Sequence, residues 1–495
     1  MSPKKILFFF AIILLLSACA SAAPQPTPTA GETPLPEPAN ATRRLTILYT
    51  NDEHGWMEGV QEGRGAANMM GLWREQENYS QDGPFLVLSG GDMWTGPAIS
   101  SWFDGESMAE VMNAMGYDAA AIGNHEFDFG LEGLQERAAQ SEFPFLSANI
   151  RDKETGEIAN IALPYVVQEV NGVQVGLIGL TTPDTPETTH PDNVASFNFI
   201  SLKEALTETV PQARAEGAEL LVVAGHICYD EQAWLAPTAA ELGVAIIGGG
   251  HCNHKLTTAL DGVTLISGGS YMEGYVRVDI AFDTETDTVV DIEARYNSNH
   301  GGTPDPEIAT LVAGWRAQAD EALTQVVGYL EQPIIRRSNA MINLVLNAWL
   351  EAYPAADIAL TNRGSFRQMM PAGDVTLEAI IGVLPFNNVL IDVELTGAEL
   401  IRNIECCQPA AAGVTTAGRY TLSDGTPLDP DAAYHVLVND FMYAGGDGFK
   451  FQEQDPEAYN TAIDWRQPII DWISALNTSP ENPLDGYLDT ENWQW

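Results

Sequence analysis

The sequence predicts an α/β protein of two or three domains. Between residues 44 and 296, short apolar runs alternate with longer amphipathic stretches. The runs are continuously apolar, which is typical of parallel strands covered on both faces. The chain has 495 residues, of which 45% are hydrophobic. This share supports a large core without special cross-links.

Five apolar runs predict five strands, and each run breaks at small or polar residues. Residues 106–116 and 202–217 predict helices between them. Residues 166–179 predict a hairpin with an Asn-Gly turn. This order of strands and helices indicates an α/β domain at 44–303. The strands are RLTILYT at 44–50, PFLVLSGG at 84–91, DAAAIG at 118–123, AELLVVAG at 218–225 and GVAIIGGG at 243–250.

A second domain is expected after a break that contains glycine and proline. Residues 305–323 predict an amphipathic helix, which we interpret as a linker between domains, at 304–327. Residues 328–495 mix helical and strand patterns and predict an α+β domain. Its helical patterns lie at 339–353 and 376–384, and its strand patterns at 387–397 and 433–440.

The N-terminus predicts export and a membrane tether. A short basic start and the apolar run ILFFFAIILLL indicate a lipoprotein signal peptide at 1–18. The letters LSAC resemble the bacterial lipobox, whose cysteine, here Cys19, is lipidated. Residues 19–43 are rich in proline and threonine and predict a disordered tether. We therefore expect a lipid-anchored protein at the bacterial cell envelope; the alternative is an ordinary signal peptide with an incidental Cys19.

The chain is strongly acidic, with 23 basic and 68 acidic residues and a formal net charge of −45. This charge argues against nucleic acid as a partner, and against binding to an anionic membrane surface except through the anchor. Anionic phosphate can bind such a chain only where metal ions or a local arginine cluster reverse the sign of the charge.

Polar side chains follow the predicted strands of the first domain. In open α/β sheets, ligands bind beyond the carboxyl ends of the strands. A single aspartate there is usually a turn or helix cap, but five such strand ends favour a ligand site. Imidazole, carboxylate and amide groups suit two divalent metals, and one carboxylate such as Asp92 can bridge ions about 3.5–4 Å apart. The residues are Asp52, His54, Asp92, Asn124, His125, Asp128, His226, His251, Asn253 and His254.

Eight motifs lie along the chain: ILYTNDEHG, LSGGDMWTG, IGNHEFDFG, VAGH, IGGGHCNH, TNRGSFR, VLPFNNVL and NDFMYAGGDGF. The first five resemble those of the calcineurin-like metallophosphoesterases, in the branch of bacterial 5′-nucleotidases and UDP-sugar hydrolases. The last three resemble the second domain of that branch. The resemblance covers nearly the whole chain after the tether. It implies an N-terminal two-sheet α/β metallophosphoesterase sandwich, a linker helix and a C-terminal α+β nucleotide-binding domain.

The resemblance also implies a set of metal ligands and two divalent metal ions, such as zinc, manganese or cobalt. The family completes the first metal site with His or Gln two positions after its last ligand. This chain has Asn253 there, and the adjacent His254 is the chemical alternative. In this interpretation Asp52 and His54 bind the first metal, Asp92 bridges, and Asn124, His226 and His251 bind the second.

The segment NHEFD at 124–128 carries the expected catalytic pair. By the resemblance, His125 is the catalytic imidazole that stabilises charge on the phosphoryl group or leaving oxygen. Asp128 orients and charges His125. Glu126 is expected to be a first-turn carboxylate favoured by the helix dipole.

The second domain is expected to select the substrate. By the resemblance, Phe386 and Phe441 sandwich the base, and stacking of this kind tolerates different bases. Arg367 matches an arginine that contacts the substrate, and Asn388 and Asp447 match polar positions near the base and ribose. Arg336 and Arg337 are either further anion contacts or a solvated surface pair.

Four cysteines remain after Cys19, and no CxxC pair occurs among them. Cys228 follows His226 by two residues, and Cys252 directly follows His251. If both histidines meet at one metal, these cysteines form a disulfide, or a pair of thiols just outside the metal ligands. Cys406 and Cys407 have no functional interpretation from the sequence.

The expected function is metal-dependent release of phosphate from 5′-nucleotides, with possible cleavage of UDP-sugars, by a water molecule that two metals activate. We expect a monomer with a small nucleotide as substrate. One alternative is a 2′,3′-cyclic nucleotide 2′-phosphodiesterase with 3′-nucleotidase activity. A related sulfur-oxidation thiosulfohydrolase is disfavoured by the aromatic pair, and the last alternative is a non-catalytic nucleoside-binding lipoprotein.

Overall fold

The computed structural model describes residues 41–415 and 420–490. The expected signal peptide, its lipidation site Cys19 and nearly all of the tether at 19–43 lie outside the described residues. Within the described part of the chain, every helix is too short or too polar to cross a membrane.

Two six-stranded sheets are built from twelve of the strands between β1 and β14. Their orders are β14-β13-β1-β2-β3-β4 and β11-β12-β10-β9-β7-β6. Central strands run parallel, since β1 pairs with β2, and β9 pairs with β7 and β10. The first sheet contains β1 (Thr42–Thr50), β2 (Phe85–Ser89), β3 (Ala119–Ala121), β4 (Phe145–Leu146), β13 (Gly274–Asp283) and β14 (Thr288–Ser298). The second contains β6 (Tyr165–Val170), β7 (Val173–Thr181), β9 (Leu220–His226), β10 (Val244–Gly248), β11 (Lys255–Leu260) and β12 (Val263–Gly268).

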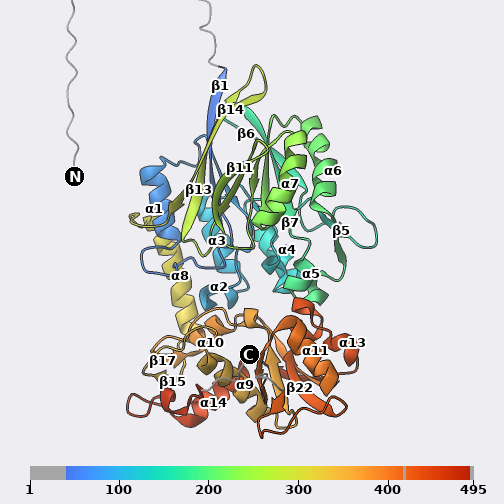
Figure 1. Ribbon diagram of the computed structural model, residues 1–495. Helices are drawn as coiled ribbons and strands as arrows, with labels where there is room; N and C mark the ends of the chain where they lie inside the picture. The colour runs from blue at the N-terminus through green and yellow to red at the C-terminus, as the bar shows by residue number, and fades with distance from the viewer. Residues whose placement is uncertain (1–40, 416–419, 491–495) are drawn as a thin grey trace, which may run out of the picture. The chain divides into compact units, whose positions relative to one another are not determined.

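Three apolar layers join these sheets and their helices into a sandwich. Between the sheets, Ile47 and Tyr49 of β1 share a buried cluster with Val222 of β9. The outer face of the first sheet packs on α1 (Ala66–Gln76) and α3 (Glu106–Met115). The outer face of the second packs on α6 (Leu202–Ala215) and α7 (Tyr229–Glu241). Figure 1 shows α1 on one side of the strands and α6 and α7 on the other.

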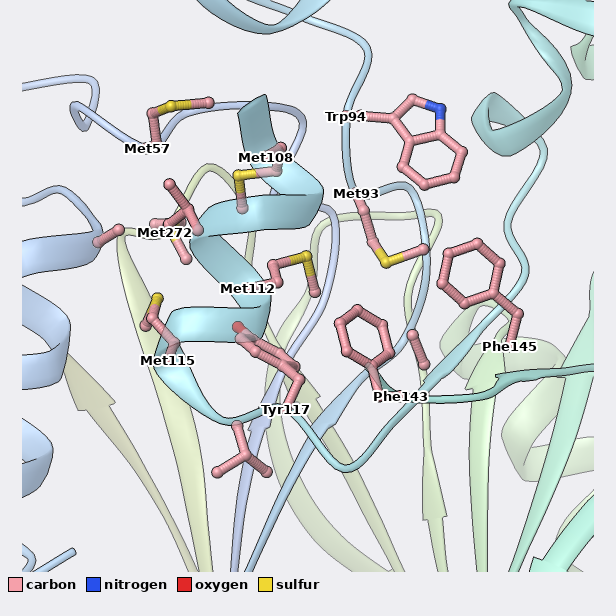
Figure 2. Close-up of a cluster of buried hydrophobic side chains, with 14 of the residues drawn as sticks. Met57, Met93, Trp94, Met108, Met112, Met115, Tyr117, Phe143, Phe145 and Met272 are labelled. Atoms are coloured by element: carbon pink, nitrogen blue, oxygen red, sulfur yellow. The ribbon is translucent and has the colours of Figure 1, made fainter. Parts of the chain in front are cut away.

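The buried cluster around α3 is rich in methionine. Figure 2 shows Met108, Met112 and Met115 of this helix near Met93 and Trp94. Flexible thioether side chains fill irregular gaps in a core. Because Met93 and Trp94 directly follow Asp92, this packing anchors the loop that presents Asp92.

The predicted strands and helices of the first domain are present. The five apolar runs form β1, β2, β3, β9 and β10, and the two predicted helices are α3 and α6. The predicted hairpin is the antiparallel pair β6 and β7. Its turn residues Asn171 and Gly172 have φ of 51° and 78°. Positive φ at both positions is the geometry that favours Asn-Gly in a two-residue hairpin.

The C-terminal part contains a five-stranded sheet with the order β19-β16-β22-β18-β23. Helices α9 and α14 share one buried cluster with it, and α11 shares another. Its strands are β16 (Ile358–Thr361), β18 (Val389–Thr396), β19 (Ala410–Ala412), β22 (Ala433–Asn439) and β23 (Tyr459–Asp464). Its main helices are α9 (Asn339–Ala352), α10 (Leu377–Val383), α11 (Gly397–Cys407) and α14 (Gln467–Leu476).

The predicted helix at 305–323 is α8 (Pro306–Leu323). The Asp305 side chain caps it by accepting hydrogen bonds from the backbone N–H groups of Glu307 and Ile308. Ile308 and Trp315 pack into the same cluster as α1 and α3. The helix therefore packs against the first sheet's outer layer, while the exact domain boundaries stay predictions.

Candidate active site

Five of the predicted metal ligands lie on backbone in the left-handed region. Their φ values lie between 48° and 66°, which is uncommon for residues other than glycine. Such conformations cost about 1–3 kcal/mol each and cluster at functional sites. The five are Asp52, His54, Asp92, His251 and Asn253.

Four ligand atoms converge on one point at the ends of β9 and β10. The Nε2 atom of His226 lies 3.0 Å from Oδ2 of Asp92 and 3.2 Å from Oδ1 of Asn124. The Nδ1 atom of His251 lies 3.0 Å from the same Asn124 oxygen and 3.3 Å from His226 Nε2. Two imidazole nitrogens and two oxygens that face one another at this range fit a divalent metal ion.

A second group of ligand atoms shares the Asp92 carboxylate. His54 Nε2 lies 3.8 Å from Asp92 Oδ2 and 3.9 Å from Asp52 Oδ1. Among the described residues, that Asp52 oxygen is buried and accepts no hydrogen bond. A buried carboxylate oxygen without a partner is costly, so this atom fits a cation. Asp92 Oδ2 thus faces both groups, as a bridging ligand would.

The other ring nitrogens of two histidines are fixed by backbone carbonyl groups. His226 Nδ1 donates to Gly90 O at 2.7 Å, and His54 Nδ1 donates to Thr95 O at 2.8 Å. A carbonyl can only accept, so both Nδ1 atoms carry the proton and both Nε2 atoms remain available as ligands.

The charges at this site depend on one another. Burial raises the pKa of Asp52 to about 7. Burial opposes protonation of His226, but the Asp92 carboxylate outweighs it and raises the pKa of His226 to about 10. Burial and the nearby charge of His226 lower the pKa of His251 to about 4. The ligand set therefore holds protons that a bound cation would replace.

His125 and Asp128 form a hydrogen-bonded pair beside these groups. His125 Nδ1 donates to Asp128 Oδ2 at 2.7 Å. The other Asp128 oxygen accepts from Thr189 Oγ1 at 3.2 Å. Burial opposes protonation of His125, but the Asp128 carboxylate outweighs it and raises the pKa of His125. Asp128 thus favours the charged form of the His125 ring and orients it with Nε2 free of Asp128.

Glu126 lies in the first turn of a helix, as expected, namely the short 3-10 helix η1 (His125–Phe127). Its side chain is fully buried, however, and also bonds to backbone outside this helix. Glu126 Oε2 accepts from the backbone N–H groups of Asp92 at 2.8 Å and Gly123 at 2.6 Å. Its Oε1 accepts from Met93 N–H at 2.7 Å. Glu126 therefore joins two strand-end loops, one of which carries Asp92 and the other Asn124.

The alternatives at 253 and 254 differ in position. Asn253 lines the cavity over the ligand groups, and the lining residues found among the described ones do not include His254. Its position therefore favours Asn253 over His254 as the residue that completes the first metal site.

A cavity of about 950 Å³ joins the ligand groups to the C-terminal part. All the predicted substrate residues lie along it, as do Arg336 and Arg337. The Phe386 ring lies 5.8 Å from the His125 ring, and the Arg367 guanidinium carbon lies 5.6 Å from the Phe386 ring centre. The C-terminal lining residues include Arg336, Arg337, Arg367, Phe386, Asn388, Phe441 and Asp447.

Polar bonds hold the predicted base-site residues in place. Asn388 Nδ2 donates to Asp440 Oδ1 at 2.5 Å, and Asp447 Oδ2 accepts from Asn362 Nδ2 at 2.8 Å. Gly446 lies under the Phe441 ring, and a Cβ there would collide with it. The glycine thus lets the aromatic ring lie flat against the chain.

Sequence reasoning missed a segment of the first part that reaches this cavity. His190 lines it, and its Nε2 lies 3.9 Å from Asp440 Oδ2. The segment holds α5 (Thr185–Thr188) and is remote in sequence from every motif, so no local signal marks it.

Both remaining cysteine pairs form disulfides. Cys228 and Cys252 are joined with Cα atoms 5.3 Å apart, and Cys406 and Cys407 with Cα atoms 3.7 Å apart. Of the two alternatives expected for Cys228 and Cys252, the structure therefore has the disulfide and not the pair of thiols.

Comparisons with known proteins agree with this arrangement. Residues 326–454 match the family model described as the 5′-nucleotidase C-terminal domain. A 5′-nucleotidase of Vibrio cholerae is 28% identical, over 96% of this chain and 95% of that protein. A 5′-nucleotidase precursor of Thermus thermophilus is 25% identical, with a TM-score of 0.75 over 88% of this chain and 97% of that one. A sulfate thiohydrolase of Thermus thermophilus shares the fold. It is 18% identical, with a TM-score of 0.70 over 93% of this chain and 99% of that one.

The fold is that of a calcineurin-like phosphoesterase domain followed by a second, C-terminal domain. Over nearly its whole length the chain is similar to 5′-nucleotidases, and its residues 326–454 match their C-terminal domain. This likeness supports a hydrolase.

Proposed function

We propose that this protein releases phosphate from 5′-nucleotides in a reaction that depends on two divalent metal ions. The observation that carries the proposal is the pair of ligand groups that share Asp92 Oδ2. Asp52, His54, Asp92 and Asn253 would hold one ion. Asn124, His226 and His251 would hold the other together with Asp92.

In this proposal the chain's own residues place the substrate and manage its charge. Two bound cations would supply positive charge that polarises the phosphoryl group and lowers the pKa of a water molecule. The His125 imidazole, held by Asp128, would donate a hydrogen bond from Nε2 to a phosphoryl or leaving oxygen. Developing negative charge on that oxygen strengthens this bond in the transition state.

The C-terminal side of the cavity supports a nucleotide as the substrate. Phe386 and Phe441 offer ring faces for a base, and the Arg367 guanidinium lies over the Phe386 ring. Burial lowers the pKa of His54, and the positive charge of Arg367 lowers it further, so this charge acts on the ligand group that contains Asp52 and His54. A phosphate in this space would meet cations on one side and Arg367 on the other.

We also propose that the mature protein is exported and anchored through Cys19. The observation behind this is the apolar run followed by LSAC and a tether rich in proline. Metabolic labelling with a fatty acid analogue tests it: wild type should carry label and Cys19→Ala should not. Label in the variant would contradict the lipid anchor.

The function is tested by phosphate release from AMP, using the chain from Ala41 onward so that β1 stays intact. Activity should require added Mn²⁺ or Co²⁺ and vanish with EDTA. Turnover of a 2′,3′-cyclic nucleotide or a UDP-sugar without AMP turnover would replace the proposed substrate. Absence of both metal binding and activity would refute the proposal and favour a nucleoside-binding protein.

A further inference from the structure

The Cys228–Cys252 disulfide connects the two loops that carry His226 and His251. Cys228 follows His226 by two residues, and Cys252 directly follows His251. Their sequence separation is 24 residues, and their Cα atoms lie 5.3 Å apart. The covalent bond therefore lies beside the two imidazoles of one proposed metal site.

The two histidines are held very differently by the rest of the protein. His226 ends β9, is fully buried and donates to Gly90 O. His251 lies beyond β10 with a φ of 66°, and residues 252–255 after it are exposed. Few packing contacts hold an exposed turn, so the position of His251 depends on its tethers.

Among the described residues, one backbone hydrogen bond joins the His251 turn directly to the β9 loop. The N–H of Gly250 donates to Ile227 O at 3.0 Å. The disulfide adds a second tether on the other side of His251, because Cys252 follows it. Further along, the N–H of Gly269 donates to His254 O at 2.9 Å. The disulfide is the covalent tether directly after His251, and it limits the freedom of the histidine to rotate.

The Cys228 end of the disulfide is firmly anchored. Cys228 is the residue before α7, and its N–H donates to Glu231 Oε2 at 2.9 Å. Glu231 Oε1 in turn accepts from Thr182 Oγ1 at 3.3 Å. The exposed His251 turn is thus tied through sulfur to a helix start that is fixed at two further points.

We infer that Cys228 and Cys252 are positioning residues whose disulfide sets the affinity of the metal site formed by Asn124, His226 and His251. The inference rests on the proposed function, because it concerns that function's second metal. Histidine nitrogens must lie about 2.0–2.1 Å from a bound zinc ion. A turn already held in place loses less freedom when the ion binds, which tightens binding.

The chain supplies a matched control in its other disulfide. Cys406 and Cys407 are adjacent at the end of α11, in the C-terminal part. They do not line the cavity defined by the described residues. Replacing them removes the same chemical group without touching the His251 turn.

The experiment compares C228S/C252S with C406S/C407S and wild type. Each metal-free protein is titrated calorimetrically with Mn²⁺ and with Zn²⁺, and its thermal unfolding is recorded without metal. In C228S/C252S the second metal ion should bind at least about tenfold more weakly than in wild type. Loss of this size is typical when a group that orients a metal ligand is removed. The control should stay within about twofold of wild type.

Reduction of folded wild type with a phosphine provides an independent measurement if C228S/C252S does not fold. The phosphine is oxidised as each disulfide becomes two thiols, and reoxidation should restore the affinity. The same reduction of C406S/C407S should weaken the second metal as in wild type. Unchanged affinity for both metals after loss of Cys228–Cys252, even with a lower Tm, would overturn the inference. Fewer than two metals in oxidised wild type would instead refute the proposed metal centre itself.

Discussion

Replacing Glu126 by glutamine should damage both stability and metal binding. The substitution keeps the size of the side chain but turns one oxygen into an N–H donor. The three backbone N–H groups of Asp92, Met93 and Gly123 now donate to the two oxygens of Glu126 at 2.6–2.8 Å. In either amide orientation, at least one of them would face a donor.

The size of the effect follows from these bonds. A hydrogen bond to a charged group contributes about 1.5–3 kcal/mol, and an unpaired buried donor costs about 1–3 kcal/mol. We expect Glu126→Gln to lose about 3 kcal/mol of unfolding free energy. Because the loops it joins carry Asp92 and Asn124, metal affinity should fall by about 10- to 100-fold.

Urea unfolding of the metal-free protein and calorimetric metal titration measure the two effects. Glu132→Gln is the control, because Glu132 is an exposed carboxylate in the next helix, α4 (Gly130–Gln140). The control should change stability by no more than about 0.5 kcal/mol. If Glu126→Gln behaved like the control in both assays, the bridging role assigned to Glu126 would be refuted.

Three further predictions concern catalysis, substrate binding and pH. His125→Asn should keep both metals but lower kcat for AMP by about 10²- to 10⁴-fold; full activity would contradict its catalytic role. Phe386→Ala should raise KM for AMP by about 10-fold or more through lost stacking and leave turnover of p-nitrophenyl phosphate unchanged; equal effects on both substrates would argue against base stacking. Burial raises the pKa of Asp52 to about 7 and of Glu53 to about 8. The folded state then binds more protons than the unfolded state, so stability in EDTA should fall as pH rises from 6 to 9; a flat or rising profile in urea unfolding would show that these shifts are absent.

The strands and most of the site were predictable because both leave local signals. An apolar run that ends in Gly and then a polar residue marks the end of a parallel strand, and β2 followed by Asp92 is an example. Parallel strands end at the same edge, so side chains remote in sequence could be placed together without knowing their contacts. The Asn171–Gly172 turn was predictable for the same reason, since two neighbouring residues determine it.

The contacts of Glu126 could not be predicted from local sequence patterns. Its sequence context is that of a helix first turn, and the three N–H groups it accepts from lie on two different loops. His190 is a second case, because its partner Asp440 is 250 positions away in the chain. Such contacts depend on how separate elements pack, and no pattern in the neighbouring residues carries that information.

Under the proposed function, the charge distribution would give the two parts of the chain complementary tasks in holding phosphate. With a net charge of −45, the chain as a whole repels anions. Asp52 and Asp92 strengthen that repulsion at the ligand groups, so the first part can attract phosphate only with cations bound. The C-terminal part brings Arg336, Arg337 and Arg367 to the same cavity, and these charges are permanent. In the proposed function, bound metal ions and these arginines together would reverse the sign of the charge in one place, which would restrict phosphate binding to the cavity.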